Sequence, residues 1–210
     1  MNPSIVNYQN MPCPQPVMKL AELLKSSQPA DLEVIVDNQA ALENVSRFLE
    51  SKAYEVSHQA EGALWRISAH TSVADAVTND NKKASEYQAQ YVRTPSGHDM
   101  RTLVMIISSV FGSGDDELGG KLMKNFLLTL PEMGPALWRI VLLNGGVILA
   151  AEGSPVLEQL RTLEKSGVSI FVCGTCLEHF GLLSKKMVGE TTNMLDVVTS
   201  MEVAGKVIRV

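Results

Sequence analysis

The chain has 210 residues, of which 45% are hydrophobic, and a formal net charge of −5. This length favours two domains, and the hydrophobic content is enough for ordinary globular cores. No basic run stands out, which argues against nucleic-acid binding. The apolar stretch Leu137–Ala151 contains Arg139 and is too short to span a bilayer. With no signal-peptide pattern at the N-terminus, the three cysteines indicate a cytoplasmic protein.

The first 70 residues alternate between strand and helix patterns. Strands are predicted at Ser4–Tyr8, Leu32–Val36, Tyr54–Gln59 and Leu64–Ala69, and helices at Val17–Lys25 and Gln39–Lys52. The order βαβαββ predicts a two-layer α/β sandwich, with two helices on one face of a small mixed sheet.

Cys13 stands directly before the first of these helices, in the run Met11–Pro16. Pro14 and Pro16 have no backbone N–H and suit the first turn of a helix. Thiols at helix N-termini ionise more readily, and the thiolate is the nucleophile. A buried cysteine that merely packs is the alternative, but the flanking prolines favour a reactive thiol.

Residues 71–97 are polar and show no sustained apolar period, so they predict a linker with a loose helix around Asn81–Tyr91. The expected organisation is therefore a domain at 1–70, a linker at 71–97 and a second domain at 98–210. A long linker would let each domain reach the other at high effective concentration.

The second domain alternates buried strands with helices and predicts an open, parallel-sheet α/β fold. Strands are expected at Arg101–Ile107, Trp138–Leu143, Val168–Val172 and Lys206–Val210, and helices at Leu118–Leu130, Pro155–Ser166 and Thr191–Ser200. Ser154 is the expected cap of the helix that begins at Pro155. Val147–Ala151 is a short apolar piece of undefined type.

Cys173-Gly174-Thr175-Cys176 follows the third of these strands, at the edge of the sheet where ligands bind in open α/β folds. Two thiols at this spacing can resolve one another, which favours nucleophilic or redox chemistry. We expect Cys173 to attack and Cys176 to resolve. One alternative is a metal site formed by Cys173, Cys176 and His179, although zinc usually needs four ligands. The other alternative is that the two cysteines are buried for structural reasons alone.

Gly112 and Gly114 lie in a loop that precedes a helix and that could cradle a phosphate. Asp115, Asp116 and Glu117 fill the first turn of that helix, where they would repel an anion. Nucleotide binding is therefore not expected, and neither a cofactor nor a metal is predicted.

Two family resemblances follow from these motifs. Cys13-Pro14-Gln15-Pro16 at a helix start resembles the TusA/SirA sulfur carriers over residues 3–70, although Asn10-Met11-Pro12 replaces the usual Gly-Leu-x. The loop Phe111–Asp116, the turn Asn144-Gly145-Gly146 and Cys173 resemble the DsrE-like domain over residues 100–210. The full order is similar to the YedF family, sulfurtransferase-like proteins of selenium metabolism.

The resemblance implies a sulfur or selenium carrier that relays a persulfide or perselenide through Cys13 and Cys173, supplied by a donor such as a cysteine desulfurase. It implies supporting roles for six motif residues: Pro14, Pro16, Gly112, Gly114, Asn144 and Gly174. Self-association into a homo-oligomer is also implied. A regulatory or small-ligand-binding adaptor is the alternative function.

Overall fold

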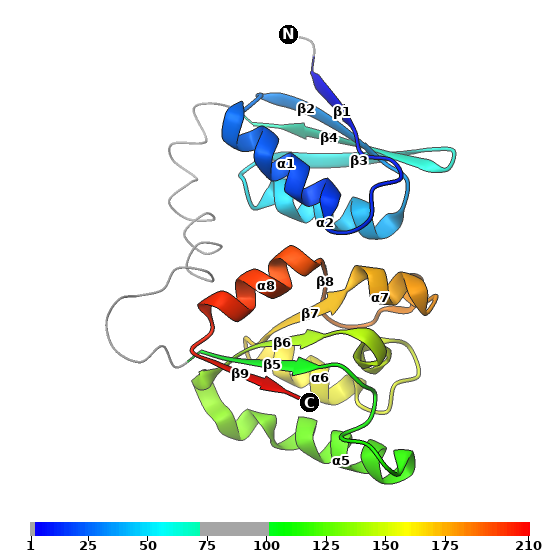
Figure 1. The fold of residues 1–210 in the computed structure, drawn as a ribbon, viewed down its shortest axis with the longest axis vertical. Helices are drawn as coiled ribbons and strands as arrows, with labels where there is room; N and C mark the ends of the chain where they lie inside the picture. Colours follow the sequence, from blue (N-terminus) through cyan, green and yellow to red (C-terminus); the bar gives the residue numbers. More distant parts are fainter. Residues whose placement is uncertain (1–2, 72–100) are drawn as a thin grey trace. The chain divides into compact units, whose positions relative to one another are not determined.

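The computed structural model describes residues 3–71 and 101–210, which belong to two compact units (Figure 1). Apart from Thr71, the segment predicted as a linker at 71–97, with its helix around Asn81–Tyr91, lies outside the described residues.

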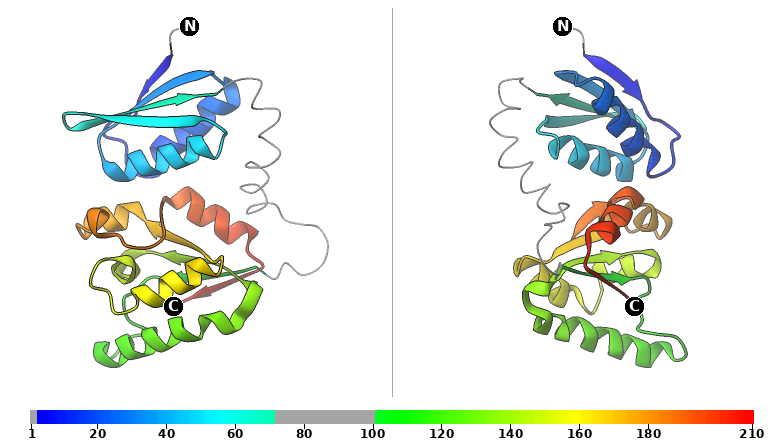
Figure 2. Two further views of the ribbon diagram at one scale, coloured as in Figure 1. Left: turned by 180° about the vertical axis from the view of Figure 1, so that it is seen from behind. Right: turned by 60° about the vertical axis from the view of Figure 1, so that its left-hand side comes forward.

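The first unit is a four-stranded sheet with two helices on one face (Figures 1 and 2). Its strands are β1 (Ser4–Asn7), β2 (Asp31–Val36), β3 (Glu55–Glu61) and β4 (Leu64–His70), and its helices are α1 (Gln15–Ser26) and α2 (Gln39–Glu50). The strand order is β1-β2-β4-β3, in which β1 is parallel to β2 and the other pairs are antiparallel. The predicted βαβαββ sandwich is confirmed.

The two faces of this sheet follow from the alternation of side chains along β2. Leu32, Val34 and Val36 are buried, while the residues between them are half-buried on the other face. The apolar stripes of both helices complete this core. Asn38 caps α2, because its side chain accepts a hydrogen bond from the Ala41 N–H at 2.7 Å.

The second unit is a five-stranded parallel sheet in the order β8-β7-β6-β5-β9. Its strands are β5 (Thr102–Ile106), β6 (Leu137–Leu142), β7 (Ser169–Cys173), β8 (Glu190–Thr192) and β9 (Lys206–Arg209). Its α-helices are α5 (Asp116–Thr129), α6 (Leu157–Lys165), α7 (Gly174–His179) and α8 (Met194–Val203). Three 3₁₀ segments join them: η1 (Leu130–Ala136), η2 (Asn144–Ala150) and η3 (Leu183–Lys185). The predicted open parallel fold is confirmed.

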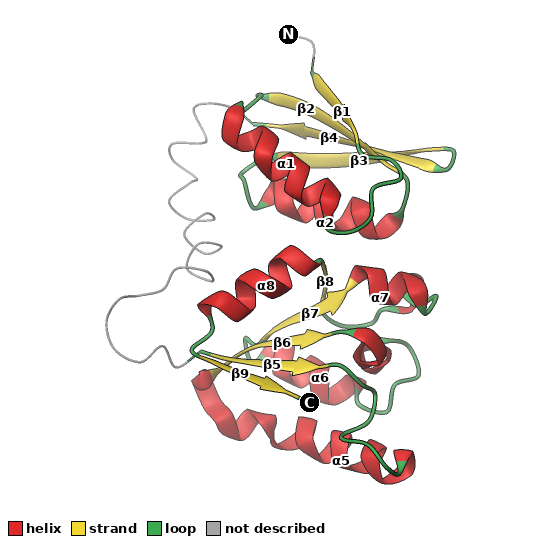
Figure 3. Ribbon diagram, in the orientation of Figure 1, coloured by secondary structure: helices red, strands yellow, loops and turns green. Residues whose placement is uncertain are grey.

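Helices cover both faces of this sheet, with α5 and α6 on one side and α8 on the other (Figures 1 and 3). The larger core lies under α5 and α6. On the α8 side, the fully buried Arg139 stacks on Phe171 and donates to the Ser200 hydroxyl at 2.7 Å. One guanidinium thus joins β6, β7 and α8.

Two helices begin later in the structure than the sequence predicts. Thr191 and Thr192 are not helical but are buried in β8, where their β-branched side chains suit an extended strand beside β7. Asn193 then caps α8, accepting from the Leu195 N–H at 2.9 Å.

The helix expected at Pro155 begins two residues later, at Leu157. Ser154 does not cap it. Instead the Ser154 hydroxyl accepts a hydrogen bond from the Val156 N–H at 3.4 Å and forms a turn that delays the first helical residue. The apolar piece Val147–Ala151 falls largely within η2. Across residues 3–71 and 101–210, no helix has the length and apolar character needed to cross a bilayer.

Candidate functional site: one thiol and a thiol pair

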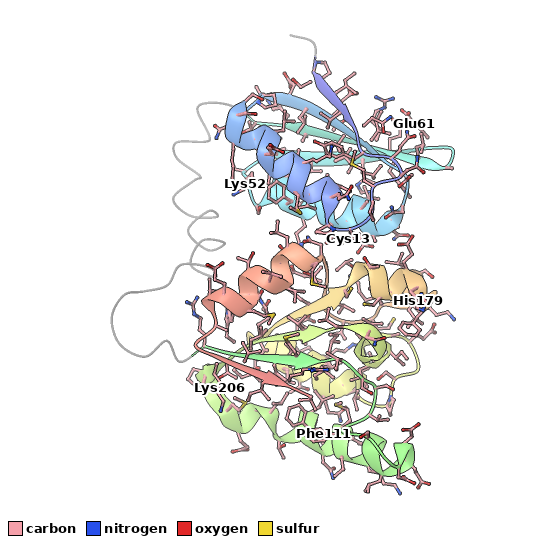
Figure 4. The ribbon with its side chains drawn as sticks, viewed as in Figure 1. Cys13, Lys52, Glu61, Phe111, His179 and Lys206 are labelled. Carbon is pink, nitrogen blue, oxygen red and sulfur yellow. The ribbon has the colours of Figure 1, made fainter. Side chains whose placement is uncertain are left out.

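Cys13 lies in the loop between β1 and α1, and its side chain is exposed (Figure 4). Pro14 stands at the N-cap position of α1 without a capping hydrogen bond, and the buried Pro16 occupies its first turn, where no backbone N–H is needed. The Gln15 N–H donates to the Pro12 carbonyl oxygen at 2.9 Å, which closes a turn around Cys13. The Cys13 thiol is therefore exposed to solvent, and Pro14 and Pro16 limit the backbone conformations of the loop that holds it.

The same loop is tied to the end of β2. The Tyr8 N–H donates to the Ile35 carbonyl oxygen at 2.9 Å, and the Asn10 N–H donates to the Asp37 carboxylate. Asn10 has a φ of 56°, in the left-handed region that asparagine tolerates better than most residues. Burial of Tyr8 raises the pKa of its hydroxyl. Sequence reasoning does not identify Asp37 as an anchor of the Cys13 loop. The signal that could indicate this role is the polar pair Asp37-Asn38, which directly follows the buried strand β2.

Cys173 and Cys176 are brought together by the junction of β7 and α7. Cys173 ends the strand and caps α7, with its Sγ accepting from the Cys176 N–H at 3.4 Å. The two Sγ atoms lie 2.8 Å apart, and neither residue is in a disulfide. Gly174 is buried in the first turn of the helix. The pair can therefore undergo thiol–disulfide exchange without a large backbone movement.

Asn144 supplies a second contact to this pair from the end of β6. Its backbone N–H donates to the Cys176 Sγ at 3.2 Å, across a separation of 32 residues. Asn144 has a φ of 46°, and the turn that follows it packs against the segment after β5. The ends of β6 and β7 thus meet at the pair. The sequence selected Asn144 as a motif residue, but its backbone contact with Cys176 is visible only in the folded chain.

Gly112 and Gly114 lie in the exposed loop before α5 and both have positive φ values, 79° and 133°. Asp115 caps α5, accepting from the Leu118 N–H at 2.7 Å. An open hollow of about 330 Å³ lies beside this loop, and it is lined by Ile107, Ser108, Val110, Gly112, Arg209 and Val210. The cysteine pair does not line this hollow.

His179 lies at the exposed end of α7, where its ring packs edge-on against Phe180 with centroids 5.1 Å apart (Figure 4). In the described part of the chain, no three His, Cys, Asp or Glu side chains are grouped as metal ligands would be. His179 therefore does not form such a group with Cys173 and Cys176.

Comparison with known proteins assigns both units. Residues 4–68 match the family model of the sulfurtransferase TusA, and residues 105–208 match the DsrE/DsrF-like family. One similar solved structure is a conserved protein of unknown function from Bacteroides thetaiotaomicron. It is 18% identical, has a TM-score of 0.41, and the match covers 56% of this chain and 100% of that chain. No curated protein matches the chain.

Both families are sulfurtransferase-type families of sulfur relay. The chain is therefore a two-domain sulfurtransferase-like protein, in which a TusA domain carrying Cys13 is joined to a DsrE-like domain carrying Cys173 and Cys176. TusA-type proteins relay sulfur with partner proteins, and protein partners for this chain are consistent with that.

Proposed function

We propose that this protein is a cytosolic carrier that passes sulfur, or selenium, as a persulfide or perselenide from Cys13 to the pair Cys173 and Cys176. One observation carries the proposal: an exposed thiol on a TusA domain and a close thiol pair on a DsrE-like domain occur in the same chain. Three reduced cysteines also suit a reducing compartment. The YedF resemblance adds selenium as a second cargo.

The surroundings of Cys13 support docking of a donor protein. Met18, which follows on the first turns of α1, is 52% exposed, and methionine adapts readily to different partner surfaces. The adjacent Lys19 is also exposed. A cysteine desulfurase would present its own persulfide here, and the Cys13 thiolate would attack the outer sulfur and release the donor thiolate.

The proposal is tested by incubating the full chain with a cysteine desulfurase and cysteine and then measuring intact and peptide masses. Cys13 should gain the mass of one sulfur atom in the parent chain. Cys13→Ser should lose this loading, because a hydroxyl is a far poorer nucleophile toward sulfur than a thiolate. Absence of any added sulfur on Cys13 in the parent would favour the adaptor function instead.

Transfer to the second domain needs a matched variant. The double variant Cys173→Ala/Cys176→Ala should load at Cys13 as the parent does but retain the sulfur there. In the parent, the sulfur should leave Cys13 and the Cys173–Cys176 peptide should change in mass. Equal retention on Cys13 in both proteins would remove the pair from the relay. Repeating the assay with selenocysteine and a selenocysteine lyase tests selenium as cargo.

A further inference from the structure

The two thiols of the pair differ in their access to solvent. Cys173 is 6% exposed and packs within the core under α5 and α6, whereas Cys176 is half-buried at the edge of that core. Attack on a sulfur donor requires access as well as a thiolate. An incoming persulfide therefore meets Cys176 first.

The position of the Cys176 sulfur is fixed from two sides. The Asn144 N–H lies 3.2 Å from Cys176 Sγ on one side, and Cys173 Sγ lies 2.8 Å from it on the other. Gly146 holds the Asn144 turn against the end of β5, so close that a Cβ there would lie 2.2 Å from the Ile106 carbonyl oxygen. Cys173 Sγ therefore faces Cys176 Sγ itself. It does not face the position of an outer sulfur atom bound to Cys176.

We propose, on the basis of the proposed relay, that the pair ends the relay by releasing the cargo as sulfide or selenide. The Cys176 thiolate first attacks the outer sulfur of the donor persulfide and displaces the donor thiolate, which leaves a persulfide on Cys176. The Cys173 thiol gives its proton to the donor thiolate displaced in the first step, and the resulting Cys173 thiolate then attacks Cys176 Sγ. The bond from that atom to the outer sulfur breaks, and its electron pair leaves with hydrosulfide.

The products are a Cys173–Cys176 disulfide and one hydrosulfide ion. The two cysteine sulfurs together lose two electrons, and the outer sulfur gains them, so one release needs no further reactant. Repeated release needs a dithiol reductant of the thioredoxin class, or glutathione, to reopen the disulfide. This order exchanges the roles expected from the strand-end position of Cys173 alone.

Hydrosulfide is a good leaving group because its conjugate acid is more acidic than an ordinary cysteine thiol, and a more acidic leaving group departs faster. The contact between the two Sγ atoms also makes Cys176 Sγ the nearer target. A pair that stored the cargo would instead pass the outer sulfur to Cys173, which would bury it.

The test uses the full chain carrying Cys13→Ser, so that the pair is examined independently of loading at Cys13. The reduced protein is mixed with one equivalent of glutathione persulfide, and sulfide and the mass of the Cys173–Cys176 peptide are followed with time. This protein should release about one sulfide per chain above the protein-free control, and its peptide should lose two hydrogen atoms.

Two variants in that background separate the steps. Cys173→Ala should keep one added sulfur atom on Cys176 and release no burst of sulfide. Cys176→Ala should neither take up sulfur at the pair nor release sulfide. Because Cys173 is buried, Cys173→Ser is tested beside Cys173→Ala, and thermal unfolding identifies any variant that has failed to fold. Whichever Cys173 variant folds is the one that decides whether Cys173 attacks Cys176 Sγ.

A stable persulfide on the pair without sulfide release would overturn the inference and leave the relay standing. Sulfide release by a folded Cys173 variant at the parent rate would also overturn it. If neither cysteine takes up sulfur in any of these proteins, the second step of the proposed relay fails as well.

Discussion

At the scale of single residues, two neighbouring glycines after β6 differ sharply in the room around them. A Cβ on Gly146 would lie 2.2 Å from the Ile106 carbonyl oxygen, a contact that backbone atoms cannot tolerate. A Cβ on Gly145 would lie 3.6 Å from its nearest neighbour, the Ser109 nitrogen, which is an ordinary contact. The turn that brings Asn144 to Cys176 therefore depends on Gly146 and not on Gly145.

Gly146→Ala should destabilise the DsrE-like domain by about 3 kcal/mol and displace the Asn144 N–H from Cys176, since the backbone must move to accept the methyl group. Gly145→Ala is the matched control and should change stability by less than about 1 kcal/mol. Chemical denaturation measures both. Equal stability of the two variants would contradict the close packing of Gly146 on the end of β5.

At the scale of elements, the exposed face of the four-stranded sheet carries a network of ion pairs centred on Arg66. Arg66 on β4 donates to Glu61 at 2.6 and 3.0 Å and to Glu33 at 2.7 Å (Glu61 is labelled in Figure 4). The Arg66 guanidinium lowers the pKa of the Glu61 carboxyl through these hydrogen bonds, and the two carboxylates raise the pKa of Arg66. These ion pairs connect β2 with the β3–β4 hairpin on the face of the sheet that the helices do not cover.

Because the pKa of Glu61 is lower in the folded state, the pair stabilises the domain above the unfolded-state pKa of glutamate. That contribution is lost as the pH falls through the folded-state pKa. Arg66→Met should therefore lower the thermal unfolding temperature at neutral pH, and the difference from the parent should shrink in acid and in high salt.

Lys19→Met, which changes an exposed lysine on α1, is the control for Arg66→Met and should show no comparable dependence on pH. Thermal unfolding followed by circular dichroism from neutral to acidic pH makes the comparison. A difference for Arg66→Met that stayed constant over that range would show that the ion pairs do not contribute.

The sequence predicted elements well where the side-chain pattern is long. The alternation in β2 and the buried runs of β5, β6 and β7 each extend over several residues, so one face or both faces could be recognised. The three-residue strand β8 has no such length, and the sequence pattern assigns its threonines to the following helix. The contact between Asn144 and Cys176 could not be predicted either, because it depends on how two strand ends pack together.

At the scale of the whole molecule, each unit has a core of its own. In the first, Leu20, Val34, Leu49 and Ile67 are fully buried between the helices and the sheet. In the second, the larger cluster lies between the parallel sheet and its helices. Among the described residues, the buried side chains named in each core come from one unit.

Residues 1–71 and residues 101–210, expressed separately, should therefore each fold and unfold cooperatively on heating. Circular dichroism and one-dimensional proton spectra measure this directly. Cys13 in the shorter fragment should still load with sulfur from a desulfurase. A fragment without a cooperative transition would show that its core is completed elsewhere in the chain.

The strand order of the first domain also bears on aggregation, because it leaves β1 and β3 at the two edges of the described sheet. Edge strands present unpaired backbone groups to neighbouring molecules, and charged side chains discourage such pairing. β3 begins and ends with exposed glutamates, whereas β1 carries Ile5, which is 59% exposed. In concentrated solution, unwanted strand pairing between copies should therefore start at β1, and acid that protonates the glutamates should remove the protection of β3.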